Sequence, residues 1–423
     1  MTGNSYKNRI SEFYNSFILL MFVYSVARAV IMPYTSASVF IIVVTAFIVY
    51  SLYKYSHMKR YSGTVLIDRN LIRTYVFLQV IIVLRGVFFN YSSLTEFLSS
   101  SFTNPYSTLA FIMPLLVFVN PEYLDFKFLK KIMMVLVFIF IYVVIDNYQA
   151  IFLETYIMRA SVEGGENYGV IVGIVGYVTS FFMLSAFLLF IPKFIPSKNW
   201  YIAFVCLLVS IVIVAIGARR SSLAYMALIM IGSIYFYTRG SNTSKAFRYI
   251  TVLSIIGILV YYITSNLDTS FSLLQERGLS NSRETVEGEF WQDMGDGLDW
   301  VFGRGLNGKY YAASTSYLDS SLSVYRNICE TGYLNIILTG GVVSLIFYIS
   351  ILLRAAWRGW FKSNNNLTKA FSAYIVVSIV SLIPFGLLSF TLTFFVVWIG
   401  VSICNNPYYL NLSDDEIKQI YFK

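Results

Sequence analysis

Long apolar stretches alternate with short polar ones along almost the whole chain. The apolar runs cover residues 14–32, 35–53, 73–89, 105–119, 132–150, 169–191, 201–217, 221–238, 249–265, 333–353, 370–386 and 388–404. A helix needs roughly 20 mostly apolar residues to cross a bilayer, and most of these runs approach that length. The fourth is short and lies between Pro105 and Pro121. The pattern predicts an all-α polytopic membrane protein with about twelve transmembrane helices.

The composition excludes a soluble protein. Of the 423 residues, 57% are hydrophobic, 18% are aromatic and only 13% are charged, and the mean hydropathy is +0.67. A soluble chain of this length cannot bury so much apolar surface. One histidine, His57, and three cysteines are too few for a zinc site, a haem site or a disulfide framework. We therefore expect no metal and no cofactor. The three cysteines are Cys206, Cys329 and Cys404, and two of them, Cys206 and Cys404, lie in apolar runs.

The distribution of charge along the chain predicts the topology. The net charge is +9, which in a soluble protein would suggest nucleic acid, but here it follows the positive-inside rule. With the N-terminus inside, the cytoplasmic segments hold 21 basic and 7 acidic residues and the outer segments hold 8 basic and 14 acidic ones. Both termini are thus predicted to be cytoplasmic. The first run lacks a small-residue cleavage pattern, so we expect its helix to be retained.

Four segments follow from this topology. They are residues 1–265 with helices one to nine, 266–332 as a large outer loop, 333–404 with helices ten to twelve, and 405–423 as a cytoplasmic tail. In the loop, Phe290, Met294, Leu298 and Phe302 recur every four residues, which predicts a short amphipathic helix at the membrane surface. Function is expected to concentrate in this loop.

The basic residues predicted on the outer side are nearly all arginine. A guanidinium group binds phosphate oxygens bidentately, whereas a lysine would serve as well for solvation. The group therefore suggests an anionic ligand, and a diphosphate is favoured; the alternative is ion pairing with the outer acids. The residues are Arg159, Arg219, Arg220, Arg277, Arg283, Arg304 and Arg326, with Lys309 the sole lysine.

Three further ionisable residues lie within apolar runs: Arg28, Arg85 and Asp146. Charges at membrane depth are functional candidates because burying them is costly unless they are paired. Snorkelling to the surface is the preferred interpretation for Arg28. For Arg85, a functional role and snorkelling to the surface both remain open. Asp146 is a possible ion-pair partner of either arginine.

Three acids in the loop, Asp293, Asp296 and Asp299, are spaced by three. This spacing fits neither an EF-hand nor a nucleotide-sugar motif, so we interpret them as a solvated loop face that binds no metal. Trp291 and Trp300 could stack on sugar rings, although interfacial aromatic belts are the usual explanation.

Together the spans, the long loop and four sequence elements resemble the O-antigen polymerase and O-antigen ligase superfamily. The first element is GARRSSLAYMAL, in which Arg219 matches the family's arginine at a helix mouth. The second is MRASVEGGENYG, from Met158 to Gly169, before the sixth span.

The third and fourth elements lie in and after the long loop. DWVFGRGLNG resembles the family's Phe-Gly-x-Gly element, and ETGYLNIILTGGVVSL resembles the element in which His-Asn-x-Tyr-Leu is followed by a glycine seven residues after the leucine. Here Glu330 stands where the ligases have the histidine, which favours a polymerase. The resemblance is best over residues 158–345. The matching residues are Phe302, Gly303 and Gly305 in the third element and Tyr333, Leu334 and Gly341 in the fourth.

The resemblance implies a GT-C-like fold and a metal-independent glycosyltransferase of the bacterial inner membrane. Donor and acceptor would be undecaprenyl-diphosphate-linked glycans, joined on the outer leaflet into O-antigen or capsular-type polysaccharide. A chain-length regulator is a possible protein partner, and nucleic acid is not expected. Glu330 is the expected base, with Asp319 in reserve, although Glu330 could instead pair with Arg326. Catalysis is assigned to Glu330 and Arg219 and diphosphate binding to Arg220, Arg159, Arg277, Arg283, Arg304, Arg326 and Arg85.

Two alternatives remain. One is an O-antigen ligase. The other is a lipid-linked oligosaccharide flippase or transporter, which would place charges along a central membrane cavity rather than on one face.

Overall fold

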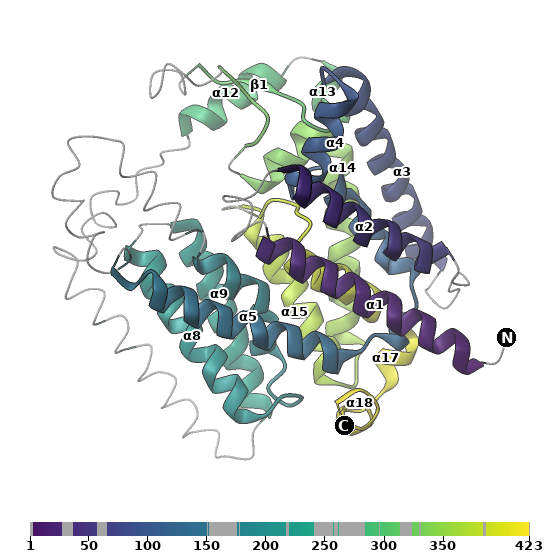
Figure 1. The fold of residues 1–423 in the computed structure, drawn as a ribbon, viewed down its shortest axis with the longest axis vertical. Coiled ribbons are helices and arrows are strands. Elements are labelled where there is room, and N and C mark those ends of the chain that lie inside the picture. Colours follow the sequence, from purple (N-terminus) through teal and green to yellow (C-terminus); the bar gives the residue numbers. More distant parts are fainter. Residues whose placement is uncertain are drawn as a thin grey trace. The chain divides into compact units, whose positions relative to one another are not determined.

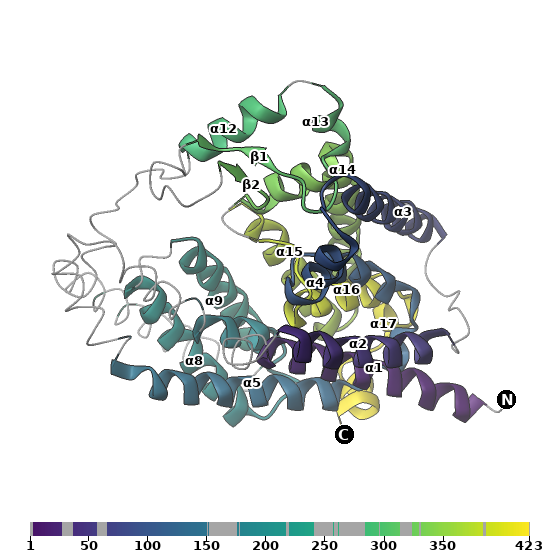
Figure 2. The same ribbon diagram turned by 45° about the horizontal axis from the view of Figure 1, so that its top comes forward.

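The structure is a computed structural model (Figures 1 and 2). It describes residues 3–27, 37–56, 66–149, 151, 176, 178–216, 220–240, 257, 261, 284–295, 297–313, 324–329, 331–383 and 386–422. The chain divides into two compact units. The first comprises Met1–Asp125 and Asn281–Ser413, and the second comprises Phe126–Ser280 and Asp414–Lys423.

The first unit is a bundle of helices with one small pair of strands. Its helices are α1 (Gly3–Val26), α2 (Ala37–Ser56), α3 (Leu66–Phe89), α4 (Leu94–Thr103), the 3₁₀ helices η2 (Thr108–Phe118) and η3 (Pro121–Tyr123), α12 (Glu284–Met294), α13 (Leu298–Phe302), α14 (Gly332–Phe361), α15 (Asn366–Ser381), α16 (Leu392–Cys404) and α17 (Pro407–Asn411). Strands β1 (Tyr310–Tyr311) and β2 (Tyr325–Arg326) pair antiparallel. Helix α14 contacts α3, α13, α15 and α16, so it is central to the unit.

The second unit is also helical. It contains α5 (Phe126–Asp146), the 3₁₀ helix η5 (Ala186–Phe190), α8 (Ser197–Ile216), α9 (Arg220–Gly240), α18 (Asp414–Ile417) and the π-helical turn η7 (Lys418–Phe422). The chain end is held by aromatic contacts, since the rings of Phe126 and Tyr421 are 5.4 Å apart and those of Phe194 and Phe422 are 5.1 Å apart. The predicted tail segment 405–423 thus contributes to both units.

Five helices in the described residues are long and apolar enough to cross a membrane. They are Arg69–Phe89, Phe126–Asp146, Ser197–Ile216, Ser221–Arg239 and Gly332–Phe361. Only helices or closed barrels satisfy their backbone groups within lipid, and these helices do so except near Gly341 within Gly332–Phe361. Shorter apolar helices accompany them. The protein is therefore an all-α membrane protein.

Eleven of the twelve predicted runs overlap described helices, while the run 249–265 lies outside the described residues except for Gly257 and Tyr261. The fourth run differs from the others because it forms the 3₁₀ helix η2, with Pro114 inside it. At about 2.0 Å per residue, a 3₁₀ helix of this length rises about 22 Å, which is less than the roughly 30 Å hydrocarbon core.

Small residues allow the helices of the first unit to approach closely. A Cβ atom on Gly359 of α14 would lie 2.4 Å from Sγ of Cys404 in α16, and one on Gly400 would lie 3.0 Å from the ring of Phe371. The Ser372 hydroxyl of α15 donates to the Ala356 carbonyl of α14 at 2.5 Å. Close backbone approach and interhelical hydrogen bonds are the main sources of association between membrane helices.

Candidate functional site

Helix α14 is interrupted near its N-terminal end. Gly341 has φ 70° and ψ 179°, a left-handed conformation that glycine adopts without strain. The interruption breaks the run of helical hydrogen bonds, so carbonyl groups just before it need other donors. In a membrane helix each carbonyl left without a donor costs several kcal/mol.

The segment after α13 supplies these donors. The N–H of Arg304 donates to the Leu338 carbonyl at 2.7 Å, and the N–H of Gly305 donates to the Thr339 carbonyl at 2.9 Å. Two glycines make this approach possible. A Cβ on Gly303 would lie 2.4 Å from the Thr339 oxygen, and a Cβ on Gly341 would lie 2.0 Å from the Val301 oxygen.

The third and fourth elements of the resemblance are therefore in direct contact. Gly303 and Gly305 belong to the Phe-Gly-x-Gly element, and Gly341 is the glycine after Tyr333 and Leu334. Gly305 and Gly341 are more than 30 residues apart in the sequence, yet each element provides the backbone space that the other requires.

Helix α3 holds the other side of the same segment. The N–H of Leu306 donates to the Ile82 carbonyl at 3.0 Å, and the Asn90 amide donates to the carbonyls of Arg304 and Leu306 at 2.8 Å each. A Cβ on Gly86 would lie 2.5 Å from the Leu306 oxygen. Residues 303–306 are thus fixed between α3 and α14. We call residues 284–295, 297–313 and 324–329 the cap.

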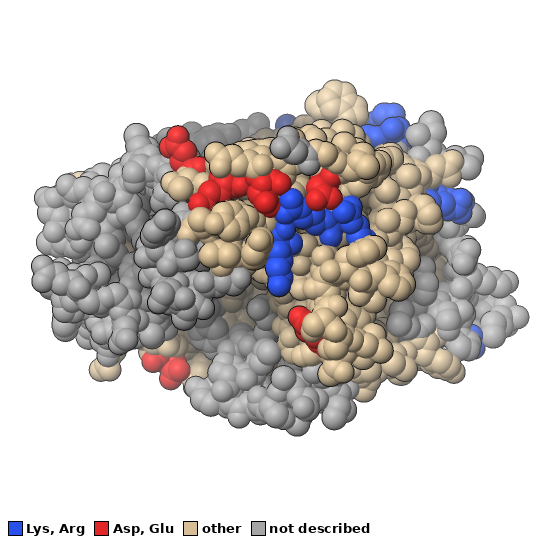
Figure 3. All heavy atoms as spheres, turned by 90° about the horizontal axis from the view of Figure 1, so that it is seen from above, with Lys and Arg blue, Asp and Glu red and all other residues tan. Residues whose placement is uncertain are grey.

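Two arginines meet at one carboxylate within the cap. Arg85 of α3 donates from Nη2 to Oδ1 of Asp299 at 2.8 Å, and Arg304 donates from Nε to Oδ2 of the same residue at 3.0 Å. Arg85 also donates to the Gly303 carbonyl, and Arg304 donates to Oδ2 of Asp293. We call Arg85, Arg304, Asp293 and Asp299 the arginine–aspartate network. Figure 3 shows acidic and basic side chains next to one another on one face of the described residues.

Further hydrogen bonds orient the Arg304 guanidinium. Its Nη2 donates to the Asp293 carbonyl at 2.9 Å and its Nη1 to the Lys309 carbonyl at 2.7 Å. The side chains of Arg304 and Asp299 are about one quarter to one third exposed, at 22% and 35%. Water and a ligand can thus reach the network, while its protein partners hold each guanidinium in a fixed orientation.

The electrostatics of the network agree with its geometry. Burial alone would raise the pKa of Asp299, but hydrogen bonds from Arg85 and Arg304 and their positive charges hold it below its usual range. Burial would lower the pKa of Arg304, and the hydrogen bonds from Arg304 to Asp293 and Asp299 raise it instead. Two arginines and two aspartates have no net charge, so an arriving anion must compete with Asp299 for the guanidinium groups.

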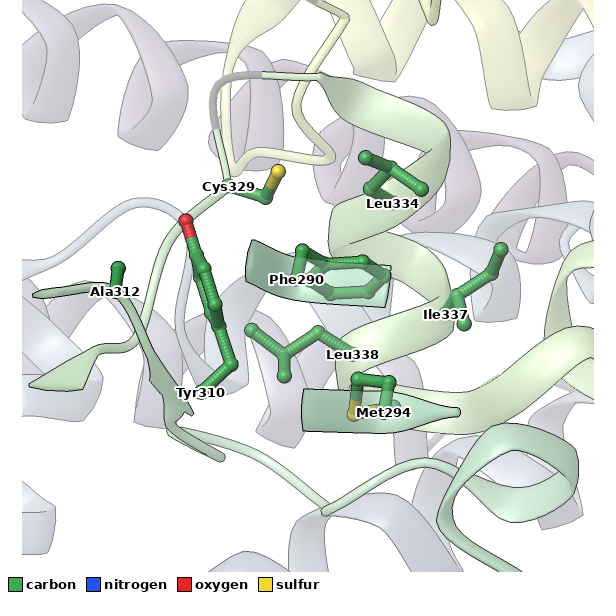
Figure 4. Packing of buried hydrophobic residues seen from close by; sticks show 8 residues of the cluster. All are labelled: Phe290, Met294, Tyr310, Ala312, Cys329, Leu334, Ile337 and Leu338. Atoms are coloured by element: carbon green, nitrogen blue, oxygen red, sulfur yellow. The ribbon is translucent and has the colours of Figure 1, made fainter. Parts of the chain in front are cut away.

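A buried apolar cluster anchors the cap to α14. Phe290 and Met294 of α12 face Leu334, Ile337 and Leu338 of α14 (Figure 4). The rings of Phe290 and Tyr310 are 5.3 Å apart in an edge-to-face arrangement. Full burial of such side chains contributes about 1.5 to 3 kcal/mol each.

The four residues Phe290, Met294, Leu298 and Phe302 do not share the one helix that their spacing predicted. Phe290 and Met294 are buried in α12, whereas Leu298 and Phe302 belong to α13 and are 73% and 52% exposed. Gly297, with φ 104°, separates the two helices. The four-residue spacing therefore continued across a helix break.

A second carboxylate contacts the start of α14. The Thr331 hydroxyl, at the N-cap position of α14, donates to Oε1 of Glu287. Glu287 and Phe290 are three residues apart on α12 and thus share its inner face. This contact is separate from the arginine–aspartate network.

The structure brings together two of the predicted site residues, Arg85 and Arg304. Arg326 lies in β2, paired in register with Tyr310, and Arg220 is the first residue of α9 in the second unit. Asp146, a possible partner of Arg85, ends α5. The other candidates lie outside the described residues: Arg28, Arg159, Arg219, Arg277, Arg283, Asp319 and Glu330.

The interpretation of the loop acids as a solvated face is wrong for Asp293 and Asp299, because both accept hydrogen bonds from Arg304. Asp296 lies outside the described residues. The nearby Gly297 and Gly303 were a usable signal, since turns at these positions fold Asp299 back towards Arg304. Nothing in the local sequence indicated Glu287 as the partner of Thr331.

No protein-family model, curated protein or solved structure matches this chain.

Proposed function

We propose that this protein is a membrane glycosyltransferase that polymerises undecaprenyl-diphosphate-linked oligosaccharide repeat units. It acts on the outer leaflet of the bacterial inner membrane and produces O-antigen or capsular-type polysaccharide. About twelve spans, a GT-C-like arrangement and cytoplasmic termini are part of this proposal.

The observation that carries the proposal is the docking of the Phe-Gly-x-Gly element onto the broken end of α14. Residues 303–305 and Gly341 form the two sides of one contact, and the arginine–aspartate network lies beside it. Two of the four elements on which the resemblance rests therefore belong to one structural unit. Their contact supports the resemblance on which the proposal depends.

The network suits a diphosphate leaving group. In the proposed reaction an acceptor hydroxyl oxygen attacks the anomeric carbon of the donor glycan. The bond from that carbon to the lipid diphosphate breaks, and its electron pair leaves with the diphosphate. Arg85 and Arg304 stabilise the growing negative charge after the diphosphate displaces Asp299, because oriented donors cost little reorganisation. The hydroxyl proton passes to Glu330, with Asp319 as the reserve base.

Two features support a polymerase over the alternatives. A transporter of anionic lipid-linked glycans needs charges along its path through the membrane, whereas the ion pairs Arg85–Asp299 and Arg304–Asp293 gather in and beside the cap. Glu330 in place of the ligase histidine favours polymerisation over transfer to another acceptor.

The test is an in vitro reaction with the purified protein in detergent, a synthetic undecaprenyl-diphosphate repeat unit and EDTA. A glycan ladder that disappears in Arg219→Ala and Glu330→Gln supports a metal-independent polymerase. Transfer to a lipid A core acceptor without a ladder indicates a ligase. Translocation in liposomes without bond formation indicates a transporter.

A further inference from the structure

A pair of tryptophan rings lies beside the arginine–aspartate network. Trp291 of α12 and Trp300 of α13 have ring centroids 4.8 Å apart, with a tilt of 58°. Trp291 is two residues before Asp293, and Trp300 directly follows Asp299. Both rings therefore lie close in the sequence to the carboxylates that accept hydrogen bonds from Arg304.

The pair is rigidly supported on its inner side. The Trp291 ring meets the Phe290 ring edge to face at 5.5 Å, and Phe290 is completely buried against α14. Trp300 packs against the same apolar cluster. Trp291 nevertheless remains 38% exposed. Large aromatic surface is held in place and left accessible, which is an arrangement typical of binding sites.

The charge of α12 opposes insertion of Trp291 into a membrane surface. The helix carries four acids, Glu284, Glu287, Glu289 and Asp293, and no lysine or arginine. Interfacial helices that bind anionic lipid are basic on their polar face, and acidic residues are repelled by such a surface. An exposed tryptophan in this setting is better explained by a ligand from the aqueous side than by an aromatic belt.

The surrounding chemistry fits a sugar. The C–H face of a pyranose ring is apolar and stacks on an indole, whereas its hydroxyl groups donate hydrogen bonds to carboxylates. Anionic sugars are disfavoured by the acids of α12. We propose that Trp291 and Trp300 bind a pyranose ring of an uncharged oligosaccharide.

This inference rests on the proposed function, because it places a sugar of the lipid-linked glycan next to its diphosphate. In this arrangement Arg85 and Arg304 contact the diphosphate, and the tryptophan pair holds a ring near it. The pair is thus a specificity-determining site that selects uncharged sugars.

The test uses the full protein in nanodiscs and measures tryptophan fluorescence against chitotetraose and cellotetraose, without lipid diphosphate. We expect a saturable change with at least one of them. Trp291→Ala should weaken that binding roughly tenfold or more, and Trp291→Phe should retain part of it. The matched control is Tyr311→Ala, since Tyr311 is an exposed aromatic residue of β1 with 44% exposure and should leave binding unchanged.

Two outcomes overturn the inference. One is the absence of a saturable change with both oligosaccharides. The other is quenching of Trp291 by brominated lipids in the nanodisc, which identifies it as a bilayer anchor. Oligosaccharide binding without a ladder in the polymerisation assay would instead contradict the proposed function and leave the sugar site intact.

Discussion

The arginine–aspartate network has two proposed roles, holding the cap against α3 and α14 and binding an anion. Asp299→Asn is the substitution that separates these roles most sharply. The side chain keeps its shape but loses the charge that both Arg85 and Arg304 contact. Partly exposed ion pairs contribute about 0.2 to 1 kcal/mol each, so two of them give at most about 2 kcal/mol. The cap should therefore open more often, by a factor of up to about 30.

The opening can be measured by amide hydrogen exchange at Arg304, Gly305 and Leu306. Their N–H groups donate to α14 and α3 carbonyls, so they exchange only when the cap detaches. Asp415→Asn is the control, because Asp415 is an exposed aspartate of α18. Unchanged exchange in Asp299→Asn would show that the network does not hold the cap.

The same variant should bind inorganic pyrophosphate more tightly. Removal of Asp299's charge gives the network a net charge of +1 and removes the carboxylate that competes for both guanidinium groups. At about 4 Å, one unit charge near a protein surface is worth about 1 to 4 kcal/mol, so affinity should rise at least about fivefold. Equal or weaker pyrophosphate binding would refute the view that Asp299 occupies the position of the anion.

Three further predictions concern the cap. Gly341→Ala should destabilise the protein by at least about 1 to 2 kcal/mol, because Gly341 has a positive φ and a Cβ there would collide with Val301. Gly288→Ala is the control, since a Cβ at Gly288 meets nothing within 4 Å, and it should be neutral or stabilising. Thermal unfolding in detergent measures both variants. Phe290→Ala should cost about 3 to 5 kcal/mol and expose the cap to limited proteolysis, and unchanged cleavage would contradict its anchoring role. The pKa of Asp299 is lower in the folded protein than its unfolded value of about 3.9. The stabilisation of the folded protein by the ionised Asp299 is therefore complete above about pH 4 and is lost as the pH falls through the pKa of the folded state. The protection factor at Gly305, which is the intrinsic exchange rate divided by the measured rate at the same pH, should then fall on acidification, and an unchanged protection factor down to this range would count against the pairing.

The apolar pattern predicted the five helices of the described residues that are long and apolar enough to cross a membrane, because burial in lipid requires long uninterrupted stretches. It failed at residues 108–118, where Pro114 and the short run produced a 3₁₀ helix. Hydrophobicity specifies where a helix lies relative to lipid, but the type of helix depends on local backbone geometry.

The cap shows a second limit of the sequence. A four-residue spacing predicted one helix from Phe290 to Phe302, and Gly297 divided it into α12 and α13. The sequence marks the glycines of two motifs, but their contact depends on tertiary packing of residue 303 against residue 341. The partner of Arg85 was equally hidden, since Asp299 follows it by more than 200 residues.

The most direct test of the central claim is the rate of polymerisation by Arg85→Lys and Arg304→Lys. Lysine keeps the charge but cannot bind an anion bidentately, so each change removes an oriented donor from the leaving group. With the synthetic lipid-linked repeat unit, we expect each variant to slow ladder formation about 100-fold, while Lys362→Ala at the end of α14 leaves it unchanged. Wild-type rates in both arginine variants would contradict the assignment of this network to the lipid diphosphate.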